Sequence, residues 1–276
     1  MAYLLMGYDT ENYLDPFLEK DLDWQVTLNF LSAVRRVHED LNAPCTLFIC
    51  GRLLEQPDVL KTLQVLAESE LFDLQQHTYS HQRLKTVVED RGEEVLFFPG
   101  ASLETIQEEV ERTNQLFEEK LGISCTGICG PFCYYRGLMD RPDILEILHR
   151  ARIRFTRTYA RNEHDYNPVS IDVQPFMYEL QGFPDILEIP SQGWQDIVLF
   201  RVNGWDWQGY ADCGRGLIDE IAQRDLVWSV CQHDWTSIHK DPNMDYTWAL
   251  IRYAQEKGVT VTSHKDFSER FRNERT

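Results

Sequence analysis

The sequence predicts an α/β fold in which a parallel sheet of about eight strands closes into a barrel. Eight short apolar runs recur along the 276 residues, at positions 3–8, 45–50, 71–74, 126–129, 153–158, 186–189, 226–231 and 259–262. Most are too short for independent helices and suit strands that are buried on both faces of a parallel sheet. Because amphipathic segments separate the runs, a barrel is the economical way to close such a sheet.

Helical periodicity predicts the segments that cover the strands. Apolar residues spaced three or four apart indicate helices at about residues 24–41, 57–66, 103–121, 142–148 and 245–257. Gly122 and Gly258 directly follow two of these segments, where a left-handed residue commonly ends a helix. The chain has no low-complexity tract, repeat or linker, so we expect one domain over residues 1–276.

The charge balance excludes some classes of partner. The chain has 45 acidic and 27 basic residues, a formal net charge of −18, which argues against nucleic acid and anionic membrane. No window approaches the roughly 18 apolar residues of a membrane span, and the first residues lack the basic leader of a secretory signal. Seven scattered cysteines then suggest reduced thiols and a cytoplasmic protein without stable membrane insertion. A homo-oligomer is compatible with the sequence.

Reactive side chains gather at the ends of the predicted strands. Asp9, His77, Cys129, His233 and His264 each end or follow one of the apolar runs. In parallel barrels the chemistry lies just past the carboxyl ends of the strands. Asp196 and Glu188 are weaker candidates at comparable positions.

The strongest local signal is the pair His77 and His81, which are four residues apart. Imidazoles at this spacing lie on one face of a helical turn and can share a divalent ion. The bare spacing also arises by chance on a surface. The position directly after a buried strand favours a metal site.

Two segments around this pair resemble a known family. Residues 45–51 (CTLFICG) and 72–81 (FDLQQHTYSH) are similar to the strand and metal motifs of polysaccharide deacetylases, carbohydrate esterase family 4. The resemblance implies a distorted (β/α) barrel of seven or eight strands. It also implies removal of N- or O-acetyl groups from sugars with zinc or another divalent ion.

The first family motif is an aspartate pair, and here it is altered. Asp9 matches the general base of the family, but Thr10 stands where the third metal ligand is expected. The resemblance therefore implies Asp9, His77 and His81 as metal ligands, with Glu11 as the alternative ligand or base. Asp9 as a simple turn or cap residue is the other interpretation.

The third family motif is altered as well. Cys129 replaces the arginine that pairs with the base in the family, and Arg136 is a candidate to supply that charge. Without a cation, the pKa of a carboxylate rises and its orientation is less fixed. Cys125, Cys129 and Cys133 recur every four residues, but Gly127, Gly130 and Pro131 interrupt any helix between them. Buried thiols are therefore favoured over a second metal site.

The fourth and fifth motifs resemble residues 205–207 (WDW) and 230–235 (VCQHDW). By this resemblance His233 is the general acid and Asp206 orients it, while a structural histidine and an aromatic core are the alternatives. A backbone N–H near Tyr134 is the candidate for stabilising the oxyanion. The predicted substrate-binding residues are Pro131, Phe132, Tyr134, Arg136, Trp205, Trp207 and Trp235.

Together these residues predict a metal-dependent deacetylase. A divalent ion, preferably zinc, would activate water, with Asp9 or Glu11 as base and His233 as acid. For a cytoplasmic enzyme we expect an N-acetylated sugar or glycan precursor as substrate. The alternatives are an allantoinase-like or other C–N hydrolase of the same superfamily, and a non-catalytic carbohydrate-binding relative, which Thr10 and Cys129 would favour.

Overall fold

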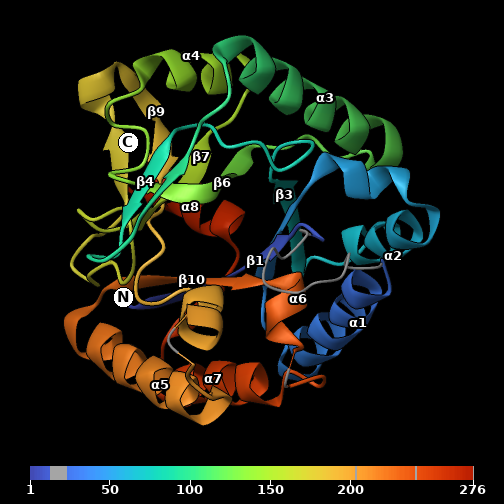
Figure 1. Cartoon of the computed structure of the whole chain (residues 1–276). Helices are drawn as coiled ribbons and strands as arrows, with labels where there is room; N and C mark the ends of the chain where they lie inside the picture. Colours follow the sequence, from blue (N-terminus) through green and yellow to red (C-terminus); the bar gives the residue numbers. More distant parts are fainter. Residues whose placement is uncertain (13–23, 203, 240, 276) are drawn as a thin grey trace.

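The computed structural model describes residues 1–12, 24–202, 204–239 and 241–275. Within these ranges, nine strands form one sheet at the centre of the molecule (Figure 1). Its strands are β1 (Tyr3–Thr10), β2 (Cys45–Ile49), β3 (Phe72–Gln76), β6 (Gly127–Tyr135), β7 (Phe155–Arg161), β8 (Phe176–Tyr178), β9 (Phe183–Glu188), β10 (Val227–His233) and β11 (Thr260–Thr262). The sequence prediction is confirmed for all eight apolar runs, whereas β8 was not predicted.

The strand order is β10-β1-β2-β3-β6-β7-β9-β8, and β11 pairs with the start of β1. Neighbouring strands on this path are parallel except β8 and β9, which are antiparallel. A separate hairpin of β4 (Val87–Asp90) and β5 (Val95–Phe98) was not predicted from the sequence.

The helices lie mostly around the outside of this sheet (Figure 1). They are α1 (Trp24–Leu41), α2 (Pro57–Ala67), α3 (Leu103–Leu121), α4 (Pro142–Arg150), α5 (Trp207–Arg224), α6 (Asp234–Ser237), α7 (Asp245–Glu256) and α8 (His264–Asn273). Of these, α8 lies near the middle of the view in Figure 1, and the short α6 is buried. Short 3-10 turns cover Gly51–Glu55 and Glu179–Gln181, and a π-helix covers Val198–Val202. The five predicted helices are confirmed, whereas α5, α6 and α8 were not predicted.

The alternation of side chains along β1 divides the core into two parts. Leu4 and Met6 pack outward against the helices, and Leu5 packs inward with Phe48 and Phe155. Successive residues of a strand point to opposite faces, so one apolar run can fill both the helix–sheet layer and the barrel interior.

The barrel is distorted where the segments that flank β8 and β9 approach β10. Side chains join the two edges here: Ser191 Oγ donates to the Ser229 carbonyl oxygen at 2.9 Å, and Gln192 Oε1 accepts from the Ser229 N–H at 2.9 Å. Gln174 Oε1 likewise accepts from the Val227 N–H at 2.9 Å. In the described part of the chain, side-chain hydrogen bonds therefore replace a backbone ladder at this seam.

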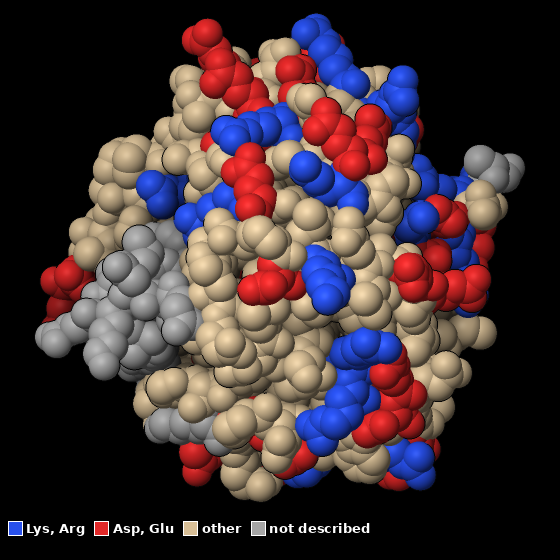
Figure 2. Space-filling model, turned by 90° about the vertical axis from the view of Figure 1, so that its right-hand side faces the viewer, with Lys and Arg blue, Asp and Glu red and all other residues tan. Residues whose placement is uncertain are grey.

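The surface is charged but mixed. On the face in Figure 2, acidic and basic side chains are interspersed rather than gathered by sign. Among the described residues, the helices are all too short or too polar to cross a bilayer.

Candidate active site

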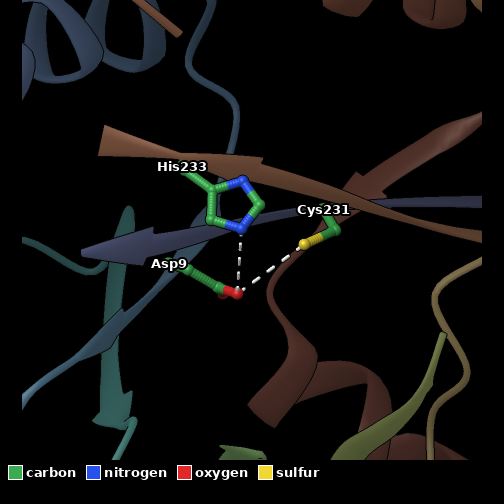
Figure 3. A group of neighbouring side chains, drawn as sticks. All are labelled: Asp9, Cys231 and His233. Carbon is green, nitrogen blue, oxygen red and sulfur yellow. Dashed lines mark hydrogen bonds and ion pairs between the residues drawn. The ribbon is translucent and has the colours of Figure 1, made fainter. Parts of the chain in front are cut away.

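The register of β1 and β10 brings Asp9 and His233 together. The two residues are direct partners in the parallel ladder, at the carboxyl ends of their strands. His233 Nε2 lies 3.9 Å from Asp9 Oδ2, and the Cys231 thiol contacts the same oxygen at 3.7 Å (Figure 3). All three side chains are buried, so a strongly polar cluster lies at one end of the barrel.

A second group, Glu11, His77 and His81, lies beside Asp9. Glu11 Oε2 is 2.8 Å from His81 Nε2 and 3.3 Å from His77 Nε2. The three side chains are buried, and their ligand atoms are close enough to hold one metal ion. Two imidazole nitrogens and a carboxylate oxygen are a donor set that suits zinc and leaves a position for water.

The hydrogen bond on the far side of His77 supports this interpretation. His77 Nδ1 lies 2.8 Å from the carbonyl oxygen of Cys129, which can only accept, so Nδ1 carries the proton. Nε2 therefore presents its lone pair toward the Glu11 carboxylate, and among the described residues it finds no hydrogen-bond partner. Two facing electron pairs in a buried site fit a bound cation.

The loop from His77 to His81 is not the helical turn that the spacing suggested. Neither residue lies in a helix, and Thr78 and His81 have φ angles of 59° and 65°. The left-handed backbone at these two positions turns the chain so that the imidazole centroids still come within 5.0 Å of each other. The convergence was predicted correctly, and the local conformation was wrong.

Glu11 is held in place to face the two imidazoles. Trp235 Nε1 donates to Glu11 Oε1 at 3.0 Å, which leaves Oε2 for His77 and His81. Burial raises the pKa of Glu11, but the two neighbouring imidazoles, His81 and His77, lower it by more than burial raises it. The pKa of Glu11 is therefore well below the usual value. Burial lowers the pKa of His81, against the opposing effect of Glu11. A carboxylate and a neutral imidazole are the forms that bind metal.

Unlike Glu11, Asp9 is paired with a cationic side chain. Its Oδ1 forms an ion pair with Arg157, while Oδ2 is 3.8 Å from His77 Nε2. Asp9 and Glu11 are two residues apart on the same side of the chain, and Thr10 points away from both. The geometry therefore favours Glu11 over Asp9 as the third ligand, a choice that the sequence left open.

Arg157 supplies the charge that Cys129 lacks. The two residues are direct partners in the β6–β7 ladder, and Arg157 Nη2 is 3.1 Å from Cys129 Sγ. Arg157 is fully buried beneath the cavity. The sequence-based suggestion of Arg136 was wrong, because Arg136 is exposed and its guanidinium stacks on the Tyr135 ring. Cys125, Cys129 and Cys133 are buried free thiols, as predicted.

His233 takes its carboxylate partner from another segment than expected. Asp196 Oδ1 lies 2.5 Å from His233 Nδ1, and Oδ2 accepts from the His233 backbone N–H at 2.9 Å. Burial lowers the pKa of His233, but Asp196 outweighs it and the pKa rises to about 9. The predicted partner, Asp206, instead caps the exposed start of α5 by accepting from Gly209 N–H at 2.8 Å.

These groups surround a small cavity of about 100 Å³. Its described lining residues are Asp9, Glu11, His81, Phe132, Arg161, Gln195, Ile197 and His233. Phe132 and Cys133 have φ angles of 70° and 50°, in a bulge of β6 beside the cavity. Left-handed backbone at such residues is strained, and strain of this kind clusters at functional sites.

Of the predicted substrate-binding residues, Phe132 is the one among the described lining residues of this cavity. Tyr134 is fully buried, where its hydroxyl donates to the Pro131 carbonyl oxygen at 2.8 Å. Trp207 stacks on Tyr246 with ring centroids 4.4 Å apart, as an aromatic core residue. Trp205 is 40% exposed, and Trp235 is buried against Glu11. A tryptophan-lined sugar site therefore stays a prediction, since none of the three is among the described residues that line the cavity.

Comparison with known proteins agrees with the fold and the motifs. Residues 26–157 match the family model described as polysaccharide deacetylase. The match spans 132 of the 276 residues, just under half of the chain. This match supports a hydrolase of the deacetylase type, whereas no curated protein sequence matches the chain significantly.

Solved structures share the barrel at low sequence identity. One, from Mycobacterium smegmatis and described as a polysaccharide deacetylase, is 14% identical with a TM-score of 0.70, over 99% of this chain and 92% of that one. The PuuE allantoinase is 12% identical with a TM-score of 0.67, over 97% and 88%. A family 4 pseudoenzyme from Bacillus anthracis is 11% identical with a TM-score of 0.56, over 97% and 65%.

Arg157, Asp196 and Arg161 are the residues of this deacetylase-type site that sequence reasoning missed. Arg157 leaves a signal, since a charged residue inside an apolar run of a buried strand must find a buried partner. Asp196 was noticed without a role. Arg161 ends β7, and its contribution depends on the bulge in the neighbouring strand β6.

Proposed function

We propose that the chain is a metal-dependent hydrolase that cleaves the C–N bond of an N-acyl compound, most simply by removing an acetyl group. The observation that carries this proposal is the adjacency of two groups: the ligand set Glu11, His77 and His81, and the acid–base pair Asp9 and His233. An N-acetylated sugar, a glycan precursor or a related small amide is the proposed substrate. We also propose zinc as the ion and the cytoplasm as the location.

A divalent ion held by Glu11, His77 and His81 would polarise the acyl oxygen and make bound water more acidic. Asp9 Oδ2 is positioned to accept a proton from the attacking water, because Oδ1 is engaged by Arg157. His233, with a pKa of about 9, is protonated at neutral pH and can give its Nε2 proton to the departing nitrogen. The C–N bond then breaks to leave a carboxylic acid and an amine.

Two other functions remain as alternatives. The small cavity and the allantoinase fold neighbour favour a C–N hydrolase that acts on a cyclic amide. A non-catalytic relative is less well supported, because both motif departures are compensated within the site. Glu11 takes the ligand position that Thr10 cannot fill, and Arg157 takes the place of the arginine missing at Cys129.

Variants of the proposed metal ligands and of the proposed base should have different effects on metal content and turnover. We expect about one divalent ion per chain in the purified parent protein. In His77→Ala and in Glu11→Gln that ion should be lost, and acetate release should decrease at least about a hundredfold. Asp9→Asn should keep the ion and lose turnover, and His149→Ala, on the exposed face of α4, should change neither.

Ammonia or amine release without acetate, from a cyclic amide, would favour the alternative hydrolase. An ion content that is unchanged in both ligand variants would overturn the metal site. Carbohydrate binding that survives in His77→Ala, with no turnover in the parent protein, would favour the non-catalytic relative.

A further inference from the structure

One cation in the wall of the cavity has no part in the mechanism above. Arg161 is the last residue of β7, and its side chain is 9% exposed at the cavity. Arginine is seldom buried to this extent unless it is paired or binds an anion. Its surroundings therefore indicate what the cavity accepts.

The guanidinium group of Arg161 is fixed from behind. Nε donates to the Phe132 carbonyl oxygen at 2.7 Å, and Nη1 contacts Glu89 Oε2 at 3.0 Å and the carbonyl oxygen of Asp165. Among the described residues these bonds use Nε and Nη1, which leaves the donors of Nη2 for a ligand. A guanidinium held in one orientation is preorganised to bind an anionic oxygen.

The charge of Arg161 is only partly compensated. Its partner Glu89 is shared, because Glu89 Oε1 also lies 2.5 Å from Arg91 Nη2. One carboxylate cannot neutralise two guanidinium groups, so Glu89 balances the charge of Arg161 only in part. A buried and incompletely paired charge is costly, and an anionic ligand would relieve that cost.

The size of the cavity limits where the anion can be. A volume of about 100 Å³ is smaller than the roughly 150 Å³ cavity that holds a benzene molecule, and well below the 300 Å³ or more of a typical ligand pocket. An acyl group and a few further atoms fill it. An anionic group that reaches Arg161 from the reacting carbon must therefore be within a few bonds of that carbon.

We infer that Arg161 binds a carboxylate of the substrate, so that the enzyme acts on small acidic N-acyl compounds. The inference rests on the proposed function and narrows its substrate class. The side-chain amide of Gln195, in the same wall and buried, can donate a second hydrogen bond to this carboxylate. A neutral carboxamide of the same size can still accept these hydrogen bonds through its carbonyl oxygen, but it lacks the negative charge that Arg161 attracts.

Turnover of matched substrate pairs tests the inference. N-acetylglycine is compared with N-acetylglycinamide, and N-acetylalanine with N-acetylalaninamide, since each pair differs only in a carboxylate against a carboxamide near the acyl nitrogen. We expect kcat/KM to be at least tenfold higher for the acid of at least one pair. Equal values within both pairs would overturn the inference while leaving the hydrolase intact.

Variants of the arginine give the second part of the test. Arg161→Gln should remove the preference, so that kcat/KM for the acid falls to about the value for its neutral partner. Arg161→Lys should keep part of the preference, because it keeps the charge and loses the planar fork. Arg136→Gln is the matched control, since that arginine is exposed and away from the cavity, and it should leave the preference unchanged.

Binding of acetate to the protein gives a readout that does not need turnover. Acetate should bind more weakly to Arg161→Gln than to the parent, and severalfold more tightly to Glu89→Gln, in which Arg161 loses its competing carboxylate. If Arg161→Gln fails to fold, the opposite change in Glu89→Gln still decides. Arg161-dependent binding without any acyl hydrolysis would retain the anion site and reject the proposed function, whereas acetate affinity that is equal in the parent and Glu89→Gln would reject the site.

Discussion

The two sides of the cavity obtain their charged groups in different ways. On the side of β1 and β3, the polar residues are near neighbours in the sequence: Asp9 and Glu11 are two residues apart, and His77 and His81 are four apart. On the side of β6, β7 and β10, the partners come from other segments. Arg157 reaches Asp9 from the strand beside Cys129, and Asp196 reaches His233 from the segment after β9.

This difference shows which residues of a barrel site must have a fixed spacing in the sequence and which can come from different strands. Two imidazoles must meet one ion within a narrow distance range, so their local spacing is constrained. A counter-charge has only to approach a carboxylate or an imidazole, and any of several neighbouring strand ends can provide it. Arg157 and Cys129 are ladder partners, so one sideways step across the sheet brings the guanidinium to the same carboxylate.

The largest expected effect comes from removing the guanidinium group that Arg157 places beside Asp9. Arg157→Met leaves the buried Asp9 carboxylate without its cation, and we expect a loss of about 3–5 kcal/mol in the free energy of unfolding. Acetate release should fall at least about a hundredfold, because the base is then less often ionised and less well oriented. Denaturant unfolding and initial rates measure the two losses.

The double variant Cys129→Arg/Arg157→Cys tests whether the guanidinium can act from the neighbouring strand. It moves the guanidinium from β7 to β6 and nearly conserves the buried volume. It should therefore be more stable and more active than Arg157→Cys alone. Strictly additive losses in the double variant would show that Arg157 acts through packing and not through its charge.

The comparison of the two sides of the cavity also explains which parts of the fold and the site could be predicted from the sequence. Apolar runs and helical periodicity predicted the eight main strands and five helices, because burial in parallel layers leaves a strong local pattern. Asp9, His77 and His233 were predicted for a similar reason, since each lies at a strand end, and His81 was predicted from its spacing to His77. The extent of the domain over residues 1–276 stays a prediction.

The missed partners depend on contacts that a linear pattern does not contain. Asp206 lies next to two tryptophans and resembled a family motif, yet it caps α5, while Asp196 approaches His233 only through the fold. The sequence could not place the tryptophans, because aromatic side chains suit a core and a sugar site equally well, and Trp207 packs on Tyr246. Arg157 and Arg161 are both on β7, and their roles depend on the register and the bulge of β6.

A smaller effect is expected from the partner of His233. Asp196 raises the pKa of His233 to about 9, so the protonated acid persists through neutral pH and is lost as the pH rises through about 9. Asp196→Asn removes that negative charge, and the pKa should fall toward the ordinary value of about 6.5. The alkaline limb of the kcat profile should therefore move to lower pH, with at least about a tenfold lower rate at pH 8.

Asp206→Asn is the control for this measurement, because Asp206 is at the exposed end of α5. Its alkaline limb should coincide with that of the parent protein. A limb that moves in Asp206→Asn and stays in Asp196→Asn would restore the interpretation drawn from the sequence motif and contradict the one drawn from the geometry.

The smallest expected effect concerns the cap itself. The side chain of Asp206 accepts a hydrogen bond from the Gly209 N–H, one of the donors that the first turn of α5 leaves unpaired. Asp206→Ala should therefore lower the free energy of unfolding by about 1 kcal/mol, as measured by denaturant titration. Among the described residues, Asp206 neither lines the cavity nor bonds to His233, so kcat and KM should stay within about twofold of the parent values. A variant that keeps its stability and loses its rate would mean that α5 carries Asp206 to the substrate in solution, and the two sides of the cavity would then differ less than the structure indicates.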